Sequence, residues 1–211
     1  MLVRHAQARN HPGTSYDAAP LSALGRMQGD ALANACAARR PHALVASPAP
    51  RAAQTAAIIA AAAGLSVTSD ERLLEYRFGS ITDPGLTLEQ LRDRRDDLLV
   101  WHPDRKLAAD AETPRAFGLR VAAVLEEIVT RHLGGNVVIV AHAGSIDAAL
   151  RWAIGIDPGI PVMHDFPIAN ASITELIHWP RGRLVGGAPR YTEFVSIGSV
   201  AHLPVASRSE N

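Results

Sequence analysis

The sequence predicts an α/β protein with a layered sheet, and three observations support this fold class. Short apolar runs typical of buried strands alternate with amphipathic helical patterns through the first two-thirds of the chain. One of these runs, residues 137–140, contains only Val and Ile, as parallel strands buried on both faces do. The 211 residues suit a single domain that is large enough to bury a substantial core.

Helix-start and helix-stop residues divide the chain into elements. Ser22 is expected to cap the first helix, and Pro41 to stop it. The second helix is expected to start at Ser47–Pro48 and to end at Gly64. The expected elements, in chain order, are a strand ending at 4, a helix over 21–40, a strand at 43–46, a helix to about 63, a strand at 65–68, a helix over 112–132, a strand at 137–140, a helix from about 145, and strands at 173–177, 184–185 and 191–197.

Composition excludes several classes of protein. The formal net charge is zero, which argues against binding of nucleic acid or of anionic membranes through bulk charge. The most apolar stretch, 56–63, is too short to span a bilayer, and the polar pair Arg4–His5 interrupts any secretory leader. Cys36 is the only cysteine and cannot form an internal disulfide, which fits a reducing setting. We therefore expect a cytoplasmic protein with no nucleic-acid or membrane partner.

Four basic side chains stand where they could meet one anion. In open α/β sheets, ligands lie outside the carboxyl ends of the strands, and Arg4–His5 and His142 stand at the carboxyl ends of predicted buried strands. Arg51 falls in the first turn of a predicted helix, where the helix dipole disfavours a cation unless an anion is bound. Each observation alone also fits an exposed side chain, but together they indicate an anion site.

Seven segments of the chain carry a family resemblance, and in order they are Leu2–Gln7 (LVRHAQ), Leu21–Gln28, Ser47–Ala56 (SPAPRAAQTA), Leu74–Gly79, Val138–Gly144 (VIVAHAG), Asn170–Thr174 and His202–Leu203. Their order and spacing resemble the histidine phosphatase superfamily, which includes the cofactor-dependent phosphoglycerate mutases. The segments span nearly the whole chain. Each is unspecific alone, whereas the ordered set is highly specific.

The resemblance implies a three-layer α/β sandwich in which a central, mostly parallel mixed sheet is flanked by helices. It implies that His5 is the nucleophile and that Glu75 protonates the leaving oxygen and then deprotonates the hydrolytic water. Because His5 must attack as a neutral imidazole, a carbonyl or carboxylate is expected to hold its other ring nitrogen. The groups implied to hold the phosphoryl oxygens are Arg4, Arg51, a protonated His142, Asn10 and Ala143. No metal ion or other cofactor is implied, and the histidine spacing contains no metal-binding motif.

The chain departs from the family pattern beside both histidines. Ala6 and Ala143 stand in place of glycines, and Gln7 stands in place of a glutamate. An alanine there costs about 1 kcal/mol only if its φ is positive. The family's asparagine fits Asn10 with a one-residue shift, while His11 has the expected spacing, so either residue can be the phosphate contact.

The resemblance favours a phosphomonoester hydrolase that acts on a small phosphorylated metabolite. One domain is expected over 1–211, with a variable segment at about 80–110 that covers the substrate. This segment is short beside the basic insertions of the mutases, so mutase activity is the second interpretation. A third, a phospho-ligand binding module without catalysis, would have lost a catalytic residue, and none is lost. A second anionic group of the substrate could contact residues that equally fit a charged surface, namely Arg77, Arg94, Arg95, His102 and Lys106. A homodimer is left open.

Overall fold

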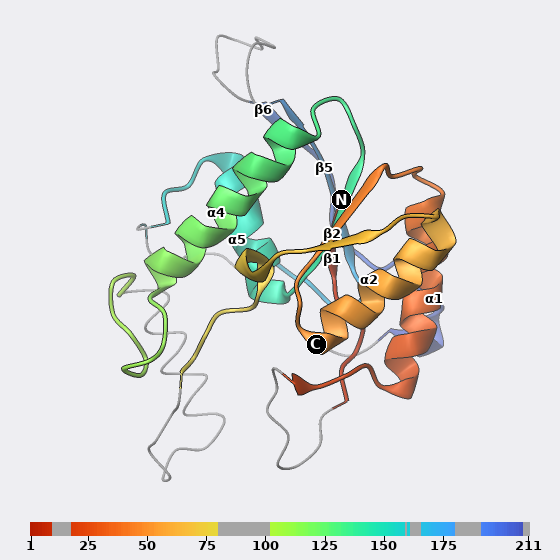
Figure 1. Cartoon of the computed structure of the whole chain (residues 1–211), viewed down its shortest axis with the longest axis horizontal. Helices are drawn as coiled ribbons and strands as arrows, with labels where there is room; N and C mark the ends of the chain where they lie inside the picture. The colour runs from red at the N-terminus through yellow and green to blue at the C-terminus, as the bar shows by residue number, and fades with distance from the viewer. Residues whose placement is uncertain (10–17, 80–101, 159, 161–165, 180–190, 209–211) are drawn as a thin grey trace.

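The computed structural model describes residues 1–9, 18–79, 102–158, 160, 166–179 and 191–208. Within this part of the chain, a six-stranded sheet lies between two pairs of helices (Figure 1). The strands are β1 Leu2–Arg4, β2 Ala43–Ala46, β3 Val67–Ser69, β4 Val137–Ala141, β5 Ile173–Trp179 and β6 Tyr191–Ser199. The helices are α1 Ala23–Ala37, α2 Pro50–Ala63, α4 Pro114–Arg131 and α5 Ala143–Ile154, with short 3-10 turns η2 Glu71–Leu73 and η3 Val205–Ser207. The predicted α/β sandwich is confirmed.

The sheet has the order β3-β2-β4-β1-β5-β6 and is mixed. β1, β2, β3 and β4 run parallel to one another, while β5 is antiparallel to both β1 and β6. The register pairs the last residue of β1 with that of β4, and the last residue of β2 with Val140. The residues that follow these strands, His5, Ser47 and His142, therefore leave the sheet at one edge.

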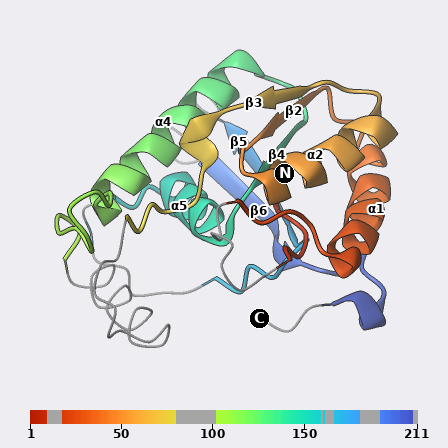
Figure 2. The same ribbon diagram turned by 60° about the horizontal axis from the view of Figure 1, so that its bottom comes forward.

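Alternate residues of the sheet face two separate cores, as the strand period requires. Leu2, Val45 and Ile139 pack in the core beneath α4 and α5. Their neighbours Val3 and Leu44 pack in the core beneath α1 and α2. Figure 2 shows the same two helical layers on either side of the strands. Both layers begin helices at the carboxyl edge, because α2 follows β2 and α5 follows β4.

The helix ends agree with the sequence at some positions and correct it at others. Ser22 caps α1 by accepting a hydrogen bond from Gly25, and Gly64 ends α2 with a φ of 67°, as expected. Ser47–Pro48 does not start α2: the first residue of that helix is Pro50, and its cap residue Ala49 makes no side-chain capping bond. The hydroxyl of Ser47 is instead used at the site described below.

Two further helices also begin at other residues than expected. α5 starts at Ala143, two residues before the expected Ser145, because His142 is its extended cap residue. α4 starts at Pro114 behind the capping hydroxyl of Thr113, so Glu112 precedes the helix rather than opening it.

Several expectations fall outside the described residues. These are Asn10, His11, Arg94, Arg95, the strand at 184–185 and most of the variable segment at 80–110. Across the residues that the structure does describe, no helix is both long enough and apolar enough to cross a bilayer.

Candidate active site

His5 is buried at the end of β1, and its surroundings determine which ring nitrogen carries the proton. Only 1% of the residue is exposed. Its Nδ1 lies 2.8 Å from the carbonyl oxygen of Ala6, which can only accept, so Nδ1 carries the proton. Its Nε2 accepts a hydrogen bond of 3.1 Å from Nε of Arg51 and therefore presents a lone pair. The expected partner of the nucleophile's other nitrogen is thus the next residue's carbonyl.

Charge and burial keep His5 neutral. Burial lowers the pKa of His5 to about 3, and the Arg51 and Arg4 guanidinium groups add to this effect, against the Ala6 carbonyl, which raises it. The pKa reference for a free histidine is about 6.5. His5 is therefore an unprotonated imidazole at neutral pH, as a nucleophile must be.

Arg51 links the two histidines. It lies in the first turn of α2, as expected, and is fully buried. Its Nε donates to His5, and its Nη2 donates to Nδ1 of His142 at 3.1 Å. The two imidazole rings meet edge to face with centroids 5.1 Å apart. The sequence expectation that these three groups converge holds in the structure.

His142 differs from the expectation of a protonated imidazole. Because Arg51 can only donate, Nδ1 of His142 is an acceptor, and its Nε2 donates to the Ser47 hydroxyl at 2.8 Å. Burial first, then His5, Arg51, Arg4 and Arg120, lower the pKa of His142 to about 2. His142 is therefore neutral in this structure, because burial and the neighbouring arginines disfavour a positive charge on its ring.

Arg4 faces the same edge of the sheet. It is the last residue of β1 and is partly buried, and its Nη1 donates to the carbonyl of Ile168. It lies close enough to lower the pKa of both His5 and His142. The site thus combines two arginines with two neutral imidazoles.

Glu75 reaches the start of α5. Its Oε2 accepts a hydrogen bond of 3.0 Å from the backbone N–H of Gly144, and its Oε1 accepts one of 2.9 Å from the N–H of Tyr76. A Cβ atom on Gly144 would lie 2.4 Å from Oε1, so a glycine there lets the carboxylate approach the helix. The Glu75 carboxylate thus contacts Gly144, two residues after His142, at a helix end that favours negative charge.

Ala143 is the first residue of α5, where backbone N–H groups have no acceptor within the helix. The amino ends of α2 and α5 therefore both lie at the carboxyl edge of the sheet, where their N–H groups attract an anion. Neither Ala143 nor Ala6 has a positive φ among the described residues, so alanine in place of glycine causes no backbone strain there.

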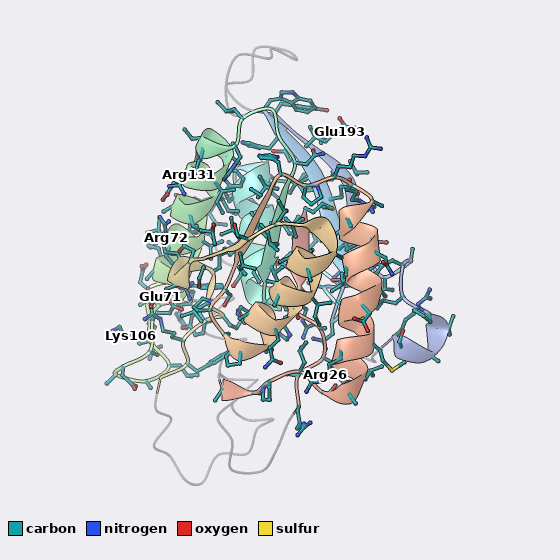
Figure 3. All side chains as sticks on the ribbon, turned by 45° about the vertical axis from the view of Figure 1, so that its right-hand side comes forward. Arg26, Glu71, Arg72, Lys106, Arg131 and Glu193 are labelled. Atoms are coloured by element: carbon teal, nitrogen blue, oxygen red, sulfur yellow. The ribbon has the colours of Figure 1, made fainter. Side chains whose placement is uncertain are left out.

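The segment that carries Glu75 is held by a largely buried ion pair. Arg120 of α4 binds Glu112 through two bonds, Nε to Oε2 at 2.9 Å and Nη2 to Oε1 at 2.6 Å, with the side chains 13% and 10% exposed. The same guanidinium donates to the carbonyls of Arg72, Leu74 and Glu75 at 2.8 to 3.0 Å. Figure 3 shows Arg72 beside α4, and there it pairs with Glu127.

Arg120 lies on α4, and only 13% of its side chain is exposed. Its guanidinium turns toward the Glu75 segment because Glu112 and three backbone carbonyls offer it acceptors there.

The loop after His5 is fixed by side chains that the sequence interpretation did not assign to the site. Thr55 accepts from the N–H of Ala6 at 3.1 Å and donates to the carbonyl of Arg51 at 2.7 Å. Gln28 accepts from the N–H of Gln7 at 2.8 Å. Asn170 donates to the carbonyl of His5 at 3.2 Å. All three lie within the segments that carry the family resemblance, which is the signal that could have identified them.

Three of the residues expected to contact a second anionic group, Arg77, His102 and Lys106, lie in the described part of the chain. Arg77 and Lys106 are exposed and His102 is partly exposed. The Lys106 ammonium donates to the carbonyl of Ala109 at 3.4 Å.

Comparison with known proteins places the chain among phosphatases. The family model described as histidine phosphatase superfamily (branch 1) matches residues 1–186. Phosphoserine phosphatase 1 of Hydrogenobacter thermophilus is 28% identical over 88% of this chain and 88% of its own length. An uncharacterized protein of Mycobacterium tuberculosis is 44% identical over 84% of this chain and 88% of its own. A mycobacterial glucosyl-3-phosphoglycerate phosphatase in complex with inorganic phosphate superposes with a TM-score of 0.71 and 27% identity, covering 96% of this chain and 98% of that one.

Proposed function

The chain belongs to branch 1 of the histidine phosphatase superfamily, and on that premise we propose that it hydrolyses small phosphomonoesters through a phosphohistidine at His5, without a metal ion. The predicted family, the α/β fold and the phosphatase class are confirmed by these matches. The roles of individual residues are the proposal.

One observation carries it: a buried, neutral His5 whose Nε2 lone pair points at a guanidinium. The carbonyl of Ala6 orients the ring, and the nearest donor to Nε2 is Arg51. A phosphoryl group that enters between them would take the arginine N–H bonds on its oxygens and leave Nε2 facing phosphorus. Arginine suits this because its planar fork binds phosphate at two points and stays charged.

In the first step, Nε2 of His5 forms a bond to phosphorus as the bond to the leaving oxygen breaks. Arg4, Arg51, His142 and the N–H groups at the start of α5 stabilise the three phosphoryl oxygens. The dianion also supplies a negative partner for the ring of His142, so binding favours the protonated imidazole of the sequence expectation. Glu75, protonated at the start, gives its proton to the leaving oxygen.

In the second step, water attacks the phosphorus of phosphohistidine and the N–P bond breaks. The Glu75 carboxylate takes a proton from that water, which restores the acid and releases inorganic phosphate. The Glu75 side chain lies at the start of α5, next to the cap residue His142, which supports its assignment to the site, and the helix end favours the carboxylate form that acts as the base.

The proposed substrate is a small phosphorylated metabolite, in line with the phosphoserine and glucosyl-3-phosphoglycerate phosphatases that the chain is similar to. The cytoplasmic location, the homodimer and the single-domain boundary at 1–211 stay predictions.

The test is a comparison of two substrates in two variants. With p-nitrophenyl phosphate, whose leaving group needs no proton, Glu75→Gln should release p-nitrophenolate in a burst stoichiometric with enzyme and then stall as phosphohistidine. With an alkyl phosphate it should give no burst, because the leaving alkoxide needs the acid. His5→Ala should be inactive on both. Glu71→Gln, an exposed residue of η2, is the matched control and should behave as wild type.

The other outcomes are equally informative. Activity of His5→Ala equal to that of wild type would refute the nucleophile, and steady wild-type turnover in Glu75→Gln would refute the acid. Phosphate binding without turnover would indicate a binding module. Interconversion of 2- and 3-phosphoglycerate would indicate a mutase. Loss of wild-type activity in EDTA would refute the metal-independent mechanism.

A further inference from the structure

One peptide group, between Ala6 and Gln7, is held on both of its sides. Its carbonyl oxygen accepts from Nδ1 of His5 at 2.8 Å, and its N–H donates to Oε1 of Gln28 at 2.8 Å. The two bonds belong to one planar unit, so whatever fixes the N–H also fixes the direction of the carbonyl. Gln28 therefore orients the ring of His5 through this peptide group, without contacting the ring.

Gln28 is itself fixed at its far end. It lies on α1, is fully buried, and its Nε2 donates to the backbone carbonyl of Ser207 at 2.7 Å. Ser207 belongs to η3 near the carboxyl end of the chain. If the amide of Gln28 flipped, its NH2 group would face the N–H donor of Gln7 and its oxygen would face the carbonyl oxygen of Ser207, so the orientation of the amide is determined.

Four groups thus form one directed row of hydrogen bonds, from the Ser207 carbonyl through Gln28 and the Ala6–Gln7 peptide to the ring of His5. Each link points the same way, and aligned hydrogen bonds polarise one another. The row makes the Ala6 carbonyl a better acceptor for Nδ1–H of His5. It therefore favours the tautomer in which Nδ1 carries the proton and Nε2 carries the lone pair.

We propose that Gln28 is a positioning residue for the phosphoryl transfer, which holds His5 in its nucleophilic tautomer through the Ala6–Gln7 peptide. This rests on the proposed function of His5. The inference distinguishes Gln28 from Arg51, which contacts Nε2 directly and binds the phosphoryl oxygens. It predicts that Gln28 serves the chemical step and contributes nothing to phosphate affinity.

The test is Gln28→Met, which keeps the volume and the helix propensity of the side chain but offers no amide. The matched control is Gln54→Met, because Gln54 also accepts from a loop N–H, that of Leu21, at 2.9 Å, and lies outside the row that ends at His5. Each variant is measured for kcat and KM with p-nitrophenyl phosphate, for inhibition by inorganic phosphate, and for melting temperature. Imidazole ¹⁵N spectra report the tautomer of His5.

We expect Gln28→Met to lower kcat about tenfold, the usual effect of losing an outer partner of a functional histidine, with phosphate inhibition unchanged. Its His5 signal should divide between two tautomers, while Gln54→Met keeps the wild-type kcat and a single Nδ1–H form. Equal kcat in the two variants, or a loss of phosphate affinity as large as the loss of kcat, would overturn the inference.

A second variant covers the case in which Gln28→Met does not fold. A chain that ends at Pro204 leaves Gln28 in place but removes the Ser207 carbonyl, and it should also lower kcat without weakening phosphate inhibition. An unchanged kcat in this chain would overturn the inference. Wild-type turnover that His5→Ala abolishes establishes the phosphatase separately, so failure of the Gln28 variants to respond leaves that function intact.

Discussion

Replacement of Arg120 by Met is the sharpest test of how the Glu75 segment is held. The substitution removes both bonds to Glu112 and the three bonds to the backbone carbonyls of Arg72, Leu74 and Glu75. It leaves the Glu112 carboxylate only 10% exposed and without its cation. Breaking a buried pair in this way costs about 3–5 kcal/mol, because the remaining charge cannot recover its hydration.

The assay is urea unfolding of wild type, Arg120→Met, Glu112→Gln and the double variant. We expect Arg120→Met to lose at least about 3 kcal/mol of the free energy of unfolding. The double variant should lose less than the sum of the singles, since the neutral amide that Glu112→Gln introduces no longer needs a cation, with a coupling of about 1–3 kcal/mol. The loosened segment should also lower kcat for an alkyl phosphate, because Glu75 is the proposed proton donor to its leaving oxygen.

Arg115→Met is the matched control. Arg115 lies on the same helix and pairs with Asp104 at 2.6 and 2.9 Å, but in solvent, with the side chains 39% and 66% exposed. Its loss should change stability little, since solvent already screens the pair. If Arg120→Met cost no more than Arg115→Met, burial would not govern the strength of the ion pair and the reasoning would be refuted.

Three further predictions concern buried groups. Burial lowers the pKa of His5 to about 3 and of His142 to about 2. The unfolded chain takes up these two protons below about pH 6.5 and the folded chain does not, so the free energy of unfolding should decrease as the pH is lowered, by up to about 1.4 kcal/mol per pH unit for each histidine. Urea unfolding that gave a constant stability from pH 7 to pH 4 would contradict this. Gly144→Ala should displace the Glu75 carboxylate, because the added Cβ would lie 2.4 Å from its Oε1 atom. We expect kcat for alkyl phosphates to fall about tenfold or more while KM is unchanged. An unchanged kcat would show that the carboxylate adapts to the added methyl group. Burial raises the pKa of Cys36 to about 11, so a thiol reagent should modify it only as fast as the protein unfolds, and rapid labelling of the native protein would disprove its burial.

The sequence alone determined the fold class, most element positions and the chemical groups of the site. Strand periodicity, caps such as Ser22 and the stop at Gly64 are short-range effects, so they can be recognised locally. The placement of His5 and His142 after parallel strands also needs only the rule that such strands end at one edge.

Only the tertiary structure decided what those groups do to one another. Every histidine has a neighbouring carbonyl, so no sequence pattern shows that the Ala6 carbonyl turns toward Nδ1 of His5. Arg120 occupies a helix position that suits solvent equally well, until Glu112 and three carbonyls are folded against it. Gln28 and Ser207 are 179 residues apart, and their bond exists because the fold packs η3 against α1. Protonation, tautomer and side-chain direction follow from burial and from distant partners, which the fold alone supplies.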